Sequence, residues 1–436
     1  MQNNIIDRQL VDNTLSQCGI SNLDDASIRD VVKVANLLEK ASSTKFVRME
    51  MGVPGLPPSK IGTEAEIDAL KAGVAQFYPM LEGFPALANE ASRFIKNFMN
   101  IDVSAASITP TVGAMQASYV AFMAVTECYK GKDTILFIDP GFPVQKTQVE
   151  VIGKPYITFD IYEYRGKQLR EKLTEYLEKG NIAAIVYSNP NNPSWVCLTE
   201  EELQIIGELA TQYDIIVLED LAYFAMDFRK DLSRPGEPPF QPTVARYTDN
   251  YILMISSSKL FNYAGQRLGL LCISDSLYNK KYDNLKARYK SEKLGYTIVY
   301  KLIYTQTSGT SHSPQYAVAA ILKAANDGTL NILNDAREYG HRANLMKKIY
   351  QDAGFHIVYD KDGDKEIGDG FYFTLIYPGM TGSQLAKELL YYGISSITLK
   401  GCGSTREGLR ACVSQVSTEQ MQALKERVDR FAKDHR

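Results

Sequence analysis

Lys259 and Arg267 are the residues whose types and setting best suit chemistry in this chain. Four apolar residues, 252–255, precede three serines, 256–258, and then Lys259. This order predicts a buried strand whose carboxyl end carries a partly desolvated lysine. Desolvation lowers the pKa of a lysine and leaves the neutral amine that imine chemistry with an aldehyde requires. Arg267 is a planar cation suited to a phosphate. The alternative for Lys259 is a solvated surface lysine.

Length and composition limit the classes of protein to which the chain can belong. Its 436 residues can bury a large core, and its net charge of −3 argues against a nucleic-acid partner, which needs a basic surface. Six scattered cysteines with no C-x-x-C pair predict a cytoplasmic protein without a disulfide or metal framework. No apolar run approaches the ~20 residues of a bilayer span, and we expect neither a signal peptide nor a membrane partner.

From Thr109 onward, apolar strand patterns alternate with helical patterns. We expect strands at 134–138, 183–187, 215–218, 251–255 and 268–273, and helices at 114–128, 168–178 and 200–213. Apolar strands separated by helices predict an α/β fold with a mostly parallel sheet covered by helices on both faces. Ligands bind such sheets beyond the carboxyl ends of the strands. Most of the polar candidates below follow these ends.

The remaining patterns predict further helices of the large domain and a smaller α+β domain formed by the two chain ends. A helix is expected to start near residue 28, with Asp24 and Asp25 as possible caps. Another is expected at 64–75, with Ile67 and Leu70 on its apolar side. Further helices are predicted at 86–100, 382–392 and 418–432, with a long one after Ser313 that breaks near 327–329, and strands at 354–358, 370–376 and 409–413. The expected organisation is 1–52 and 329–436 for the small domain and 53–328 for the large domain.

Three stretches could contact a flat, phosphorylated ligand. Gly113, Ala114 and Met115 stand at the start of a helix, where exposed N–H groups suit an anion, although many helices begin in this way. Phe142, between a Gly and a Pro, could stack on a flat ligand or pack in the core. Asn192 lies between prolines that would hold its amide in one direction, which suits either a ligand oxygen or an ordinary turn.

Four further residues could bind charged or polar groups. Asp220 ends a strand, and a buried carboxylate needs a charge partner such as a protonated ring nitrogen; the alternative is a helix cap or turn. Tyr223 could reach a phenolic oxygen. Arg410 lies in an apolar strand, where it must pair with a substrate carboxylate or form a structural salt bridge. Gly52 opens a Gly- and Pro-rich loop that either approaches a ligand or is a plain linker.

The order of these residues along the chain resembles that of the class I and II aminotransferases, a family of fold-type I enzymes that depend on pyridoxal 5′-phosphate. The likeness runs from about Gly52 to Arg410. It implies a cofactor site composed of Gly113, Ala114, Met115, Ser256 and Arg267 at the phosphate, Phe142 against the ring, Asn192 and Tyr223 at the ring hydroxyl, Asp220 at the ring nitrogen, and Lys259 as the Schiff-base lysine. Metal ligands are not implied.

The resemblance also implies how substrates and a second subunit bind. Arg410 matches the residue that clamps the substrate α-carboxylate, and Gly52, Asn192 and Trp195 are further candidates for substrate contact. Tyr78 resembles the tyrosine that crosses a dimer interface to the neighbouring cofactor's phosphate. A homodimer with shared active sites is therefore expected.

The sequence departs from the family pattern in two places. The usual N-P-T-G ending is here Asn192-Pro193-Ser194-Trp195, so that the only tryptophan of the chain replaces a glycine. In addition, members specific for dicarboxylates present an arginine shortly before the long interdomain helix, and residues 303–313 contain none. The first departure could reshape the substrate pocket, and the second argues against aspartate or glutamate recognition by that route.

The resemblance implies transfer of an amino group between an L-amino acid and a 2-oxo acid, with Lys259 as general base and acid, Asp220 protonating the ring nitrogen and Tyr223 assisting. One alternative keeps fold and cofactor but makes the enzyme a β-eliminating lyase or an amino-acid decarboxylase. A second is the cofactor-sensing domain of a transcription regulator. Such regulators carry a DNA-binding module, for which the stretch before Gly52 is too short and insufficiently basic.

Overall fold

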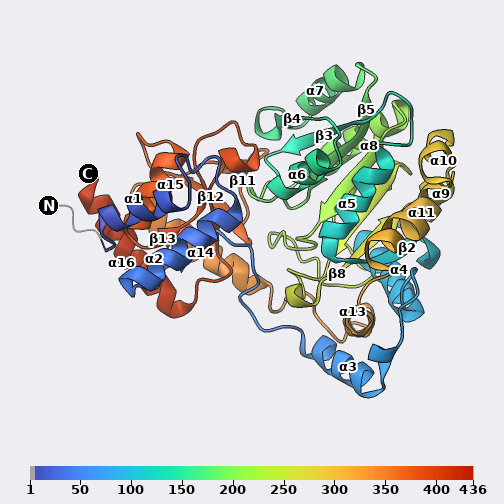
Figure 1. Cartoon of the computed structure of the whole chain (residues 1–436), viewed down its shortest axis with the longest axis horizontal. Coiled ribbons are helices and arrows are strands. Elements are labelled where there is room, and N and C mark those ends of the chain that lie inside the picture. Colours follow the sequence, from blue (N-terminus) through green and yellow to red (C-terminus); the bar gives the residue numbers. More distant parts are fainter. Residues whose placement is uncertain (1–4, 436) are drawn as a thin grey trace. The chain divides into compact units, whose positions relative to one another are not determined.

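The structure, a computed structural model, describes residues 5–435. Its largest sheet has seven strands in the order β2-β8-β7-β6-β5-β3-β4 (Figure 1). The strands are β2 (Ile108–Val112), β3 (Thr134–Asp139), β4 (Tyr156–Asp160), β5 (Ile182–Ser188), β6 (Ile216–Leu221), β7 (Tyr251–Ser256) and β8 (Leu268–Ile273). The strands from β7 to β4 pair in parallel, whereas β8 is antiparallel to both β7 and β2. The sheet is therefore mostly parallel, which confirms the prediction.

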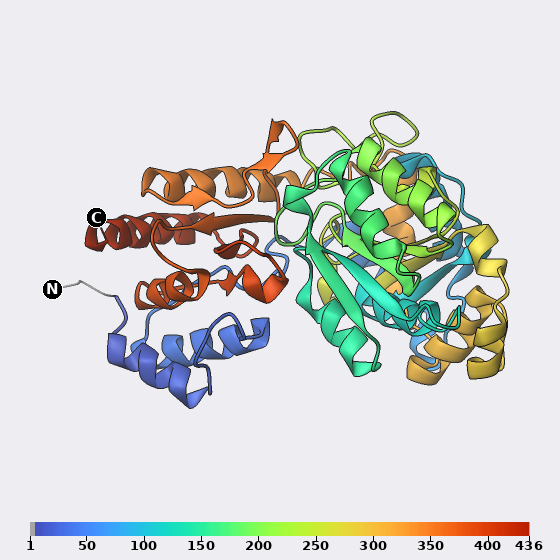
Figure 2. The ribbon, with the colours of Figure 1, turned by 90° about the horizontal axis from the view of Figure 1, so that it is seen from above.

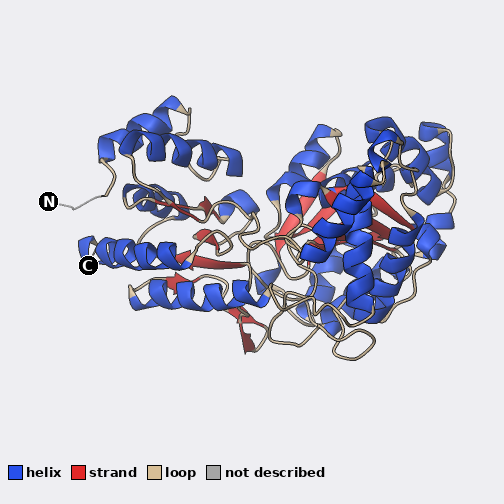
Figure 3. Cartoon of the chain, turned by 90° about the horizontal axis from the view of Figure 1, so that it is seen from below, coloured by secondary structure: helices blue, strands red, loops and turns tan. Residues whose placement is uncertain are grey.

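Helices surround this sheet, and some of them pack on other helices rather than on the strands (Figure 3). They are α3 (Lys60–Lys71), α4 (Pro85–Met99), α5 (Gly113–Val125), α6 (Pro143–Val151), α7 (Gln168–Leu177), α8 (Glu200–Gln212), α9 (Asp275–Asn279), α10 (Asp283–Tyr289), α11 (Leu294–Thr297), α12 (Tyr304–Thr307) and α13 (His312–Asn326), with a π-helix at Ile298–Ile303. Every residue of β3, β6, β7 and β8 is buried, as expected of strands covered on both faces. On one face, Ala117, Ala121 and Phe122 of α5 join the core made by alternate strand residues.

The chain divides into two compact units, which are described separately. Unit 2 consists of Leu56–Pro190 and Cys197–Ala336 and contains the seven-stranded sheet. Unit 1 consists of the described residues up to Gly55, the short segment Asn191–Val196, and the described residues from Arg337 onward.

Unit 1 contains a four-stranded antiparallel sheet in the order β14-β15-β12-β9. Its elements are β1 (Val47–Arg48), β9 (His356–Ile357), β10 (Lys361–Asp362), β11 (Lys365–Glu366), β12 (Tyr372–Ile376), β13 (Ile394–Ser395), β14 (Ile397–Thr398), β15 (Leu409–Cys412), α1 (Arg8–Gln17), α2 (Ile28–Ser42), α14 (Arg337–Asp352), α15 (Gly382–Tyr391) and α16 (Thr418–Asp434). β1 pairs in parallel with β13, which ties the N-terminal part of the chain to its C-terminal part. Figure 2 shows the N-terminal helices in blue beside the C-terminal helices in red.

All eight predicted strands are confirmed within a few residues, but the sequence analysis missed both edge strands of the large sheet. β2 has the sequence Ile-Thr-Pro-Thr-Val, and Pro110 within it is tolerated because an edge strand has one side without sheet partners. β4 is partly exposed at its first three residues, so it lacks the continuous apolar run of the central strands. Edge strands carry weaker patterns because only part of their surface is buried.

The apolar side predicted for the helix at 64–75 is wrong. In α3, Ile67 and Leu70 are 45% and 48% exposed, whereas Gly62 and Ala69 are buried. A Cβ atom at Gly62 would lie 2.6 Å from Cδ1 of Ile321 in α13. The two helices therefore pack closely through small residues, and the larger apolar side chains of α3 remain on the surface.

The start of α2 also differs from the prediction. Ser27, rather than Asp24 or Asp25, caps the helix, and its hydroxyl accepts a hydrogen bond from the N–H of Asp30 at 3.2 Å. The Asp30 carboxylate in turn accepts one from the N–H of Ser27 at 2.9 Å. This capping box satisfies two backbone donors at once. In residues 5–435, the structure contains no helix that is both long and apolar enough to cross a bilayer.

We expect Glu202→Gln to lower the free energy of unfolding by about 3 kcal/mol at pH 7. Glu202 is 1% exposed, caps α8 through the N–H of Thr199, and accepts hydrogen bonds from Nε and Nη2 of Arg165 at 2.6 and 2.9 Å. Burial raises the pKa of this carboxyl, but Arg165 and the backbone N–H groups outweigh burial and leave the pKa below its ordinary value of 4.5. The carboxylate therefore contributes stability above pH 4.5, and this contribution disappears as the pH falls through the lowered pKa.

Urea unfolding at several pH values measures this difference, which should shrink as the pH falls below 4.5. Glu201→Gln is the matched control, because Glu201 lies in the same helical turn but is exposed. Equal midpoints for the two variants at pH 7 would contradict the assignment.

Candidate active site

Lys259 lies in a hydrogen-bonded loop that leaves β7 at Ser256. The hydroxyl of Ser257 donates to the carbonyl oxygen of Leu268 at 2.7 Å, and the N–H of Ser258 donates to Oγ of Ser256 at 3.1 Å. Lys259 is half-buried, and the serines before it are buried. The loop thus holds the lysine just beyond the carboxyl end of a central strand.

Arg267 lies against the start of α5, and we refer to this pair as the candidate anion cradle. A Cβ atom at Gly113 would lie 2.6 Å from Nη2 of Arg267, and Gly113 has φ of +66°, a conformation that favours glycine. The N–H of Gly113 donates to the carbonyl oxygen of Arg267 at 2.9 Å. Ala114 and Met115 follow in the first turn of the helix. A guanidinium held beside a helix N-terminus joins two groups that attract phosphate.

The register of three strands places these groups at one edge of the sheet. Ser256 of β7 is opposite Gly269 of β8, which is opposite Thr111 of β2. Because β8 is antiparallel to both neighbours, its first residues lie beside the carboxyl ends of β7 and β2. Lys259, Arg267 and the start of α5 therefore emerge at the same edge of the sheet.

Asp220 lies in β6 with its carboxylate held from two sides. Oδ2 accepts a hydrogen bond from Nε2 of Gln145 at 2.8 Å, and Oδ1 accepts one from the N–H of Ala222 at 3.0 Å. Burial raises the pKa of Asp220 to about 6, because a low-dielectric setting disfavours the charged form. A nearby cation, such as a protonated ring nitrogen, would favour ionisation again. Tyr223 is buried in the turn that follows.

The turn after β3 carries Phe142, and the helix that follows it, α6, connects Asp220 to the anion cradle. Phe142 caps α6 and is half-buried. Gln145 of α6 holds Asp220, and Gln148, one turn later, donates from Nε2 to the carbonyl oxygen of Met115 at 2.8 Å. Neither glutamine was among the residues predicted from the sequence. Their spacing of three residues was the available signal, because it places both on one face of a helix that follows a strand end.

Tyr78, the last unit 2 candidate, is 89% exposed and lies in the loop before α4.

Arg410 lies in unit 1, in β15, and only 1% of it is exposed. Its Nη1 donates to Oδ1 of Asn192 at 3.2 Å, and its Nη2 donates to the carbonyl oxygen of Glu50. Its Cζ lies 4.6 Å from the centre of the Tyr372 ring. Asn192 therefore belongs with Arg410, since the short segment Asn191–Val196 is part of the same unit.

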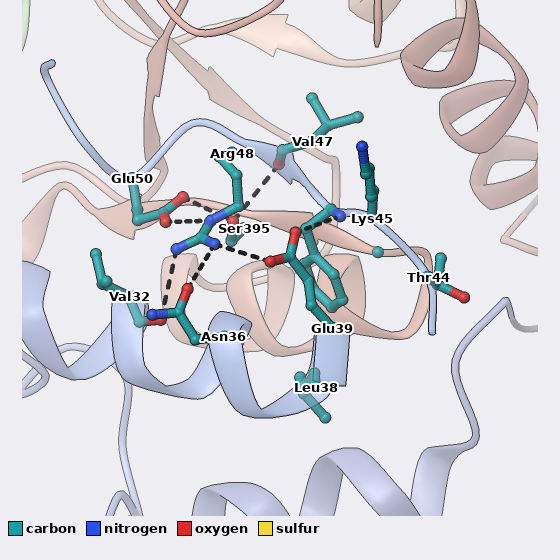
Figure 4. Close-up of polar contacts among 12 residues, drawn as sticks. Val32, Asn36, Leu38, Glu39, Thr44, Lys45, Val47, Arg48, Glu50 and Ser395 are labelled. Carbon is teal, nitrogen blue, oxygen red and sulfur yellow. Dashed lines mark hydrogen bonds and ion pairs between the residues drawn. The ribbon is translucent and has the colours of Figure 1, made fainter. Parts of the chain in front are cut away.

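A polar cluster supports the backbone beside Arg410. The carboxylate of Glu50 accepts hydrogen bonds from Nε of Arg48 at 2.6 Å and from Oγ of Ser395 at 2.7 Å (Figure 4). Arg48 also donates to Oδ1 of Asn36 at 2.8 Å. These contacts fix Glu50, whose carbonyl oxygen faces Arg410.

Trp195 and Gly52 both lie against aromatic rings in unit 1. Trp195 is fully buried with φ of +65°, and a Cβ atom at Gly370 would lie 1.8 Å from its ring. A Cβ atom at Gly52 would lie 1.9 Å from Oη of Tyr372. Tyr372 was missed by the sequence analysis. It belongs to a predicted strand next to that of Arg410, but the pairing register that makes them diagonal neighbours is visible only in the structure.

Three comparisons with known proteins agree with this architecture. The family model for aminotransferase class I and II matches residues 45–428. A probable aspartate aminotransferase of Methanocaldococcus jannaschii is 26% identical and covers 81% of this chain and 86% of its own length. An asparagine–oxo-acid transaminase of Streptococcus mutans is 25% identical, covering 73% of this chain and 74% of its own. The solved alanine aminotransferase from Pyrococcus furiosus has a TM-score of 0.74 at 22% identity, covering 93% and 96% of the two chains.

The residues of unit 2 fit pyridoxal 5′-phosphate, which has an anionic phosphate, a basic ring nitrogen and an aldehyde. The space beside Gly113 that a Cβ atom would fill adjoins Arg267, and Asp220 is a buried carboxylate suited to a cationic nitrogen. Because the family model spans most of the sequence, the chain belongs to the class I and II aminotransferases and is a transaminase that depends on pyridoxal 5′-phosphate.

Proposed function

We propose that unit 2 is the cofactor-binding domain of this transaminase and that Lys259 is the residue that attaches the cofactor. The proposal rests on one observation. The Lys259 loop, Arg267 and the start of α5 all emerge at the same edge of the sheet. The first turn of α5 and Arg267 would bind the phosphate, together with Ser256. Phe142 would stack on the ring, and Tyr223 would bind its hydroxyl.

Pyridoxal phosphate, when bound, supplies an aldehyde that reacts with amines and a ring that withdraws electrons from the substrate α-carbon. Lys259 Nζ would be the amine that holds the cofactor through its aldehyde carbon. The same Nζ would serve as the general base for the substrate α-proton and as the general acid that returns it. Asp220 holds the proton on the ring nitrogen, and the N–H groups of Gln145 and Ala222 orient its carboxylate for this task.

In unit 1, we propose that Arg410 binds the α-carboxylate of the amino acid and of the 2-oxo acid. Its guanidinium can hold a carboxylate through two parallel hydrogen bonds. Asn192 and Glu50 orient the guanidinium in its plane, which supports a defined direction of approach. Gly52 and Trp195, which surround Tyr372, complete the proposed carboxylate-binding region of unit 1. Unit 1 is then the small domain of the enzyme.

A homodimer is part of this proposal. Large apolar side chains are exposed over a short stretch of unit 2: Ile67, Leu70, Phe77, Tyr78 and Met80, which are between 45% and 89% exposed. An exposed apolar surface of this kind suits a protein partner. We assign it to a second copy of the chain, with Tyr78 reaching the phosphate bound by that copy. We also propose a cytoplasmic location, which suits the six scattered cysteines.

We expect Lys259→Ala to lose the covalent link to the cofactor, because Nζ of Lys259 is the amine that we assign to this link. Transamination should fall by at least about 10²-fold. After borohydride reduction and denaturation, mass spectrometry should find the cofactor's mass on the wild-type chain and not on the variant. Lys290→Ala, at an exposed lysine in the same unit, is the control and should keep the adduct. An intact adduct on Lys259→Ala would refute the assignment.

We expect Gly113→Ala to weaken cofactor binding by roughly tenfold or more, as the loss of one charge-assisted hydrogen bond would. The added Cβ would lie 2.6 Å from Nη2 of Arg267 and displace the guanidinium from the cradle. Fluorescence titration of the apoprotein measures the dissociation constant. Gly131→Ala is the matched control, since Gly131 also has a positive φ, +84°, but has no atom within 4 Å of an added Cβ. Equal affinity in the two variants would show that the phosphate binds elsewhere.

We expect Met80→Asp to shift the chain from dimer to monomer, because it buries a charge in the proposed interface. Met80 is 63% exposed, so the substitution leaves the core of the subunit unchanged. Sedimentation velocity over a range of concentrations measures the dissociation constant. Val151→Asp serves as the control, because Val151 is 69% exposed but lies in α6, outside the 67–80 stretch. A variant as dimeric as the control would exclude this surface from the interface.

A further inference from the structure

We propose that Tyr372 is a positioning residue for the carboxylate-binding arginine: its ring fixes the plane of the Arg410 guanidinium, and Trp195 fixes the ring. This inference rests on the proposed role of Arg410. It concerns only unit 1, in which all the residues involved lie.

The first support is the contact between the cation and the ring. Cζ of Arg410 lies 4.6 Å from the centre of the Tyr372 ring, and Arg410 is only 1% exposed. The two residues come from adjacent antiparallel strands, with Thr374 of β12 opposite Arg410 of β15. Tyr372 is two residues from Thr374 and therefore presents its side chain on the same face of the sheet. A cation–π contact is strongest in such a desolvated setting.

The second support is that the ring and the hydrogen bonds restrict different motions of the guanidinium. Asn192 and the carbonyl oxygen of Glu50 accept hydrogen bonds from Nη1 and Nη2, which limits rotation within the plane. The ring covers one face and limits tilting out of the plane. An aromatic face also stabilises the cation without accepting its N–H groups, whereas a protein carboxylate in this position would compete with the substrate's carboxylate.

The third support is the tight packing around Tyr372 itself. The ring of Trp195 meets it edge-on, with 6.3 Å between the centres and an angle of 67°. The Oη atom of Tyr372 lies only 1.9 Å from the position that a Cβ atom at Gly52 would occupy. Trp195 in turn occupies the space beside Gly370 and adopts a positive φ that is rare for a bulky residue. Two glycines and a strained tryptophan thus define the position of one tyrosine ring.

The direction of the guanidinium matters because it sets the direction of the substrate carboxylate. A misplacement of about 1 Å at a reacting centre can cost about 10²-fold in rate. Tyr372 therefore acts on the α-carboxylate, which all substrates share. Its loss should lower kcat/KM for every amino acid by a similar factor. A residue that only contacts the substrate side chain would instead change the preference among amino acids.

The test compares Tyr372→Leu with Tyr372→Phe in the full-length holoenzyme. Two quantities are measured: the dissociation constant of a simple monocarboxylate without amino or oxo groups, and kcat/KM for several amino acids. Tyr372→Leu should weaken carboxylate binding by roughly tenfold, which corresponds to the loss of a desolvated cation–π contact. It should lower kcat/KM for all donors by a similar factor. Tyr372→Phe keeps the ring and should recover most of the affinity.

Phe373→Leu is the matched control, because Phe373 is equally buried on the opposite face of the same strand. It should lower stability while leaving carboxylate affinity unchanged. If Tyr372→Leu does not fold, Tyr372→Met provides the same test, because methionine fills irregular space more readily. Wild-type affinity in a folded ring-less variant, or a change confined to one amino acid, would overturn the inference.

Arg410→Lys separates this inference from the function on which it rests. If that variant binds the monocarboxylate as tightly as the wild type, the proposed role of Arg410 fails. If it loses carboxylate binding while Tyr372→Leu keeps it, only the positioning role of Tyr372 fails.

Discussion

The antiparallel pairing of β8 with both of its neighbours is the interaction on which the rest of unit 2 depends. The register that sets Ser256 opposite Gly269 and Gly269 opposite Thr111 decides where three loops emerge. It also forces close approach: a Cβ atom at Gly269 would lie 2.7 Å from the backbone nitrogen of Ala114. The N-terminus of α5 can therefore lie beside Arg267 only because glycines occupy both contacts. This is the place at which we propose that the cofactor's phosphate binds.

Asp220 and Glu202 are two buried carboxylates held by oriented hydrogen-bond donors. Asp220 receives N–H groups from Gln145 and Ala222, and Glu202 receives the guanidinium of Arg165 together with backbone N–H groups. The outcome differs with the partner: burial leaves the pKa of Asp220 raised, whereas Arg165 brings that of Glu202 below its ordinary value. The two groups that donate hydrogen bonds to the Asp220 carboxylate, Gln145 and the N–H of Ala222, are neutral. They orient the carboxylate but do not neutralise its charge. A carboxylate of this kind is suited to a positively charged ring.

Unit 1 supports its buried arginine with oxygen atoms and an aromatic face. The ion pair of Arg48 and Glu50 supports Arg410 indirectly. It holds Glu50 in place, and the carbonyl oxygen of Glu50 accepts a hydrogen bond from Arg410. The backbone passes close to an aromatic side chain at Gly52 and at Gly370, and a Cβ atom at either position would overlap with that side chain. The tryptophan that departs from the family pattern is thus part of the packing in unit 1, where its ring meets that of Tyr372 edge-on.

The sequence by itself determined the central strands, because residues buried on both faces must be apolar, and it determined the order of chemical groups along the chain. Edge strands β2 and β4 were missed because partial burial relaxes that requirement. The buried face of α3 was wrong because close packing selected Gly62 and Ala69 over larger apolar residues. Gln145, Gln148 and Tyr372 were decided only by the tertiary structure. An amide or a ring acquires its role from the group that folding brings beside it, and neither spacing nor residue type specifies that neighbour.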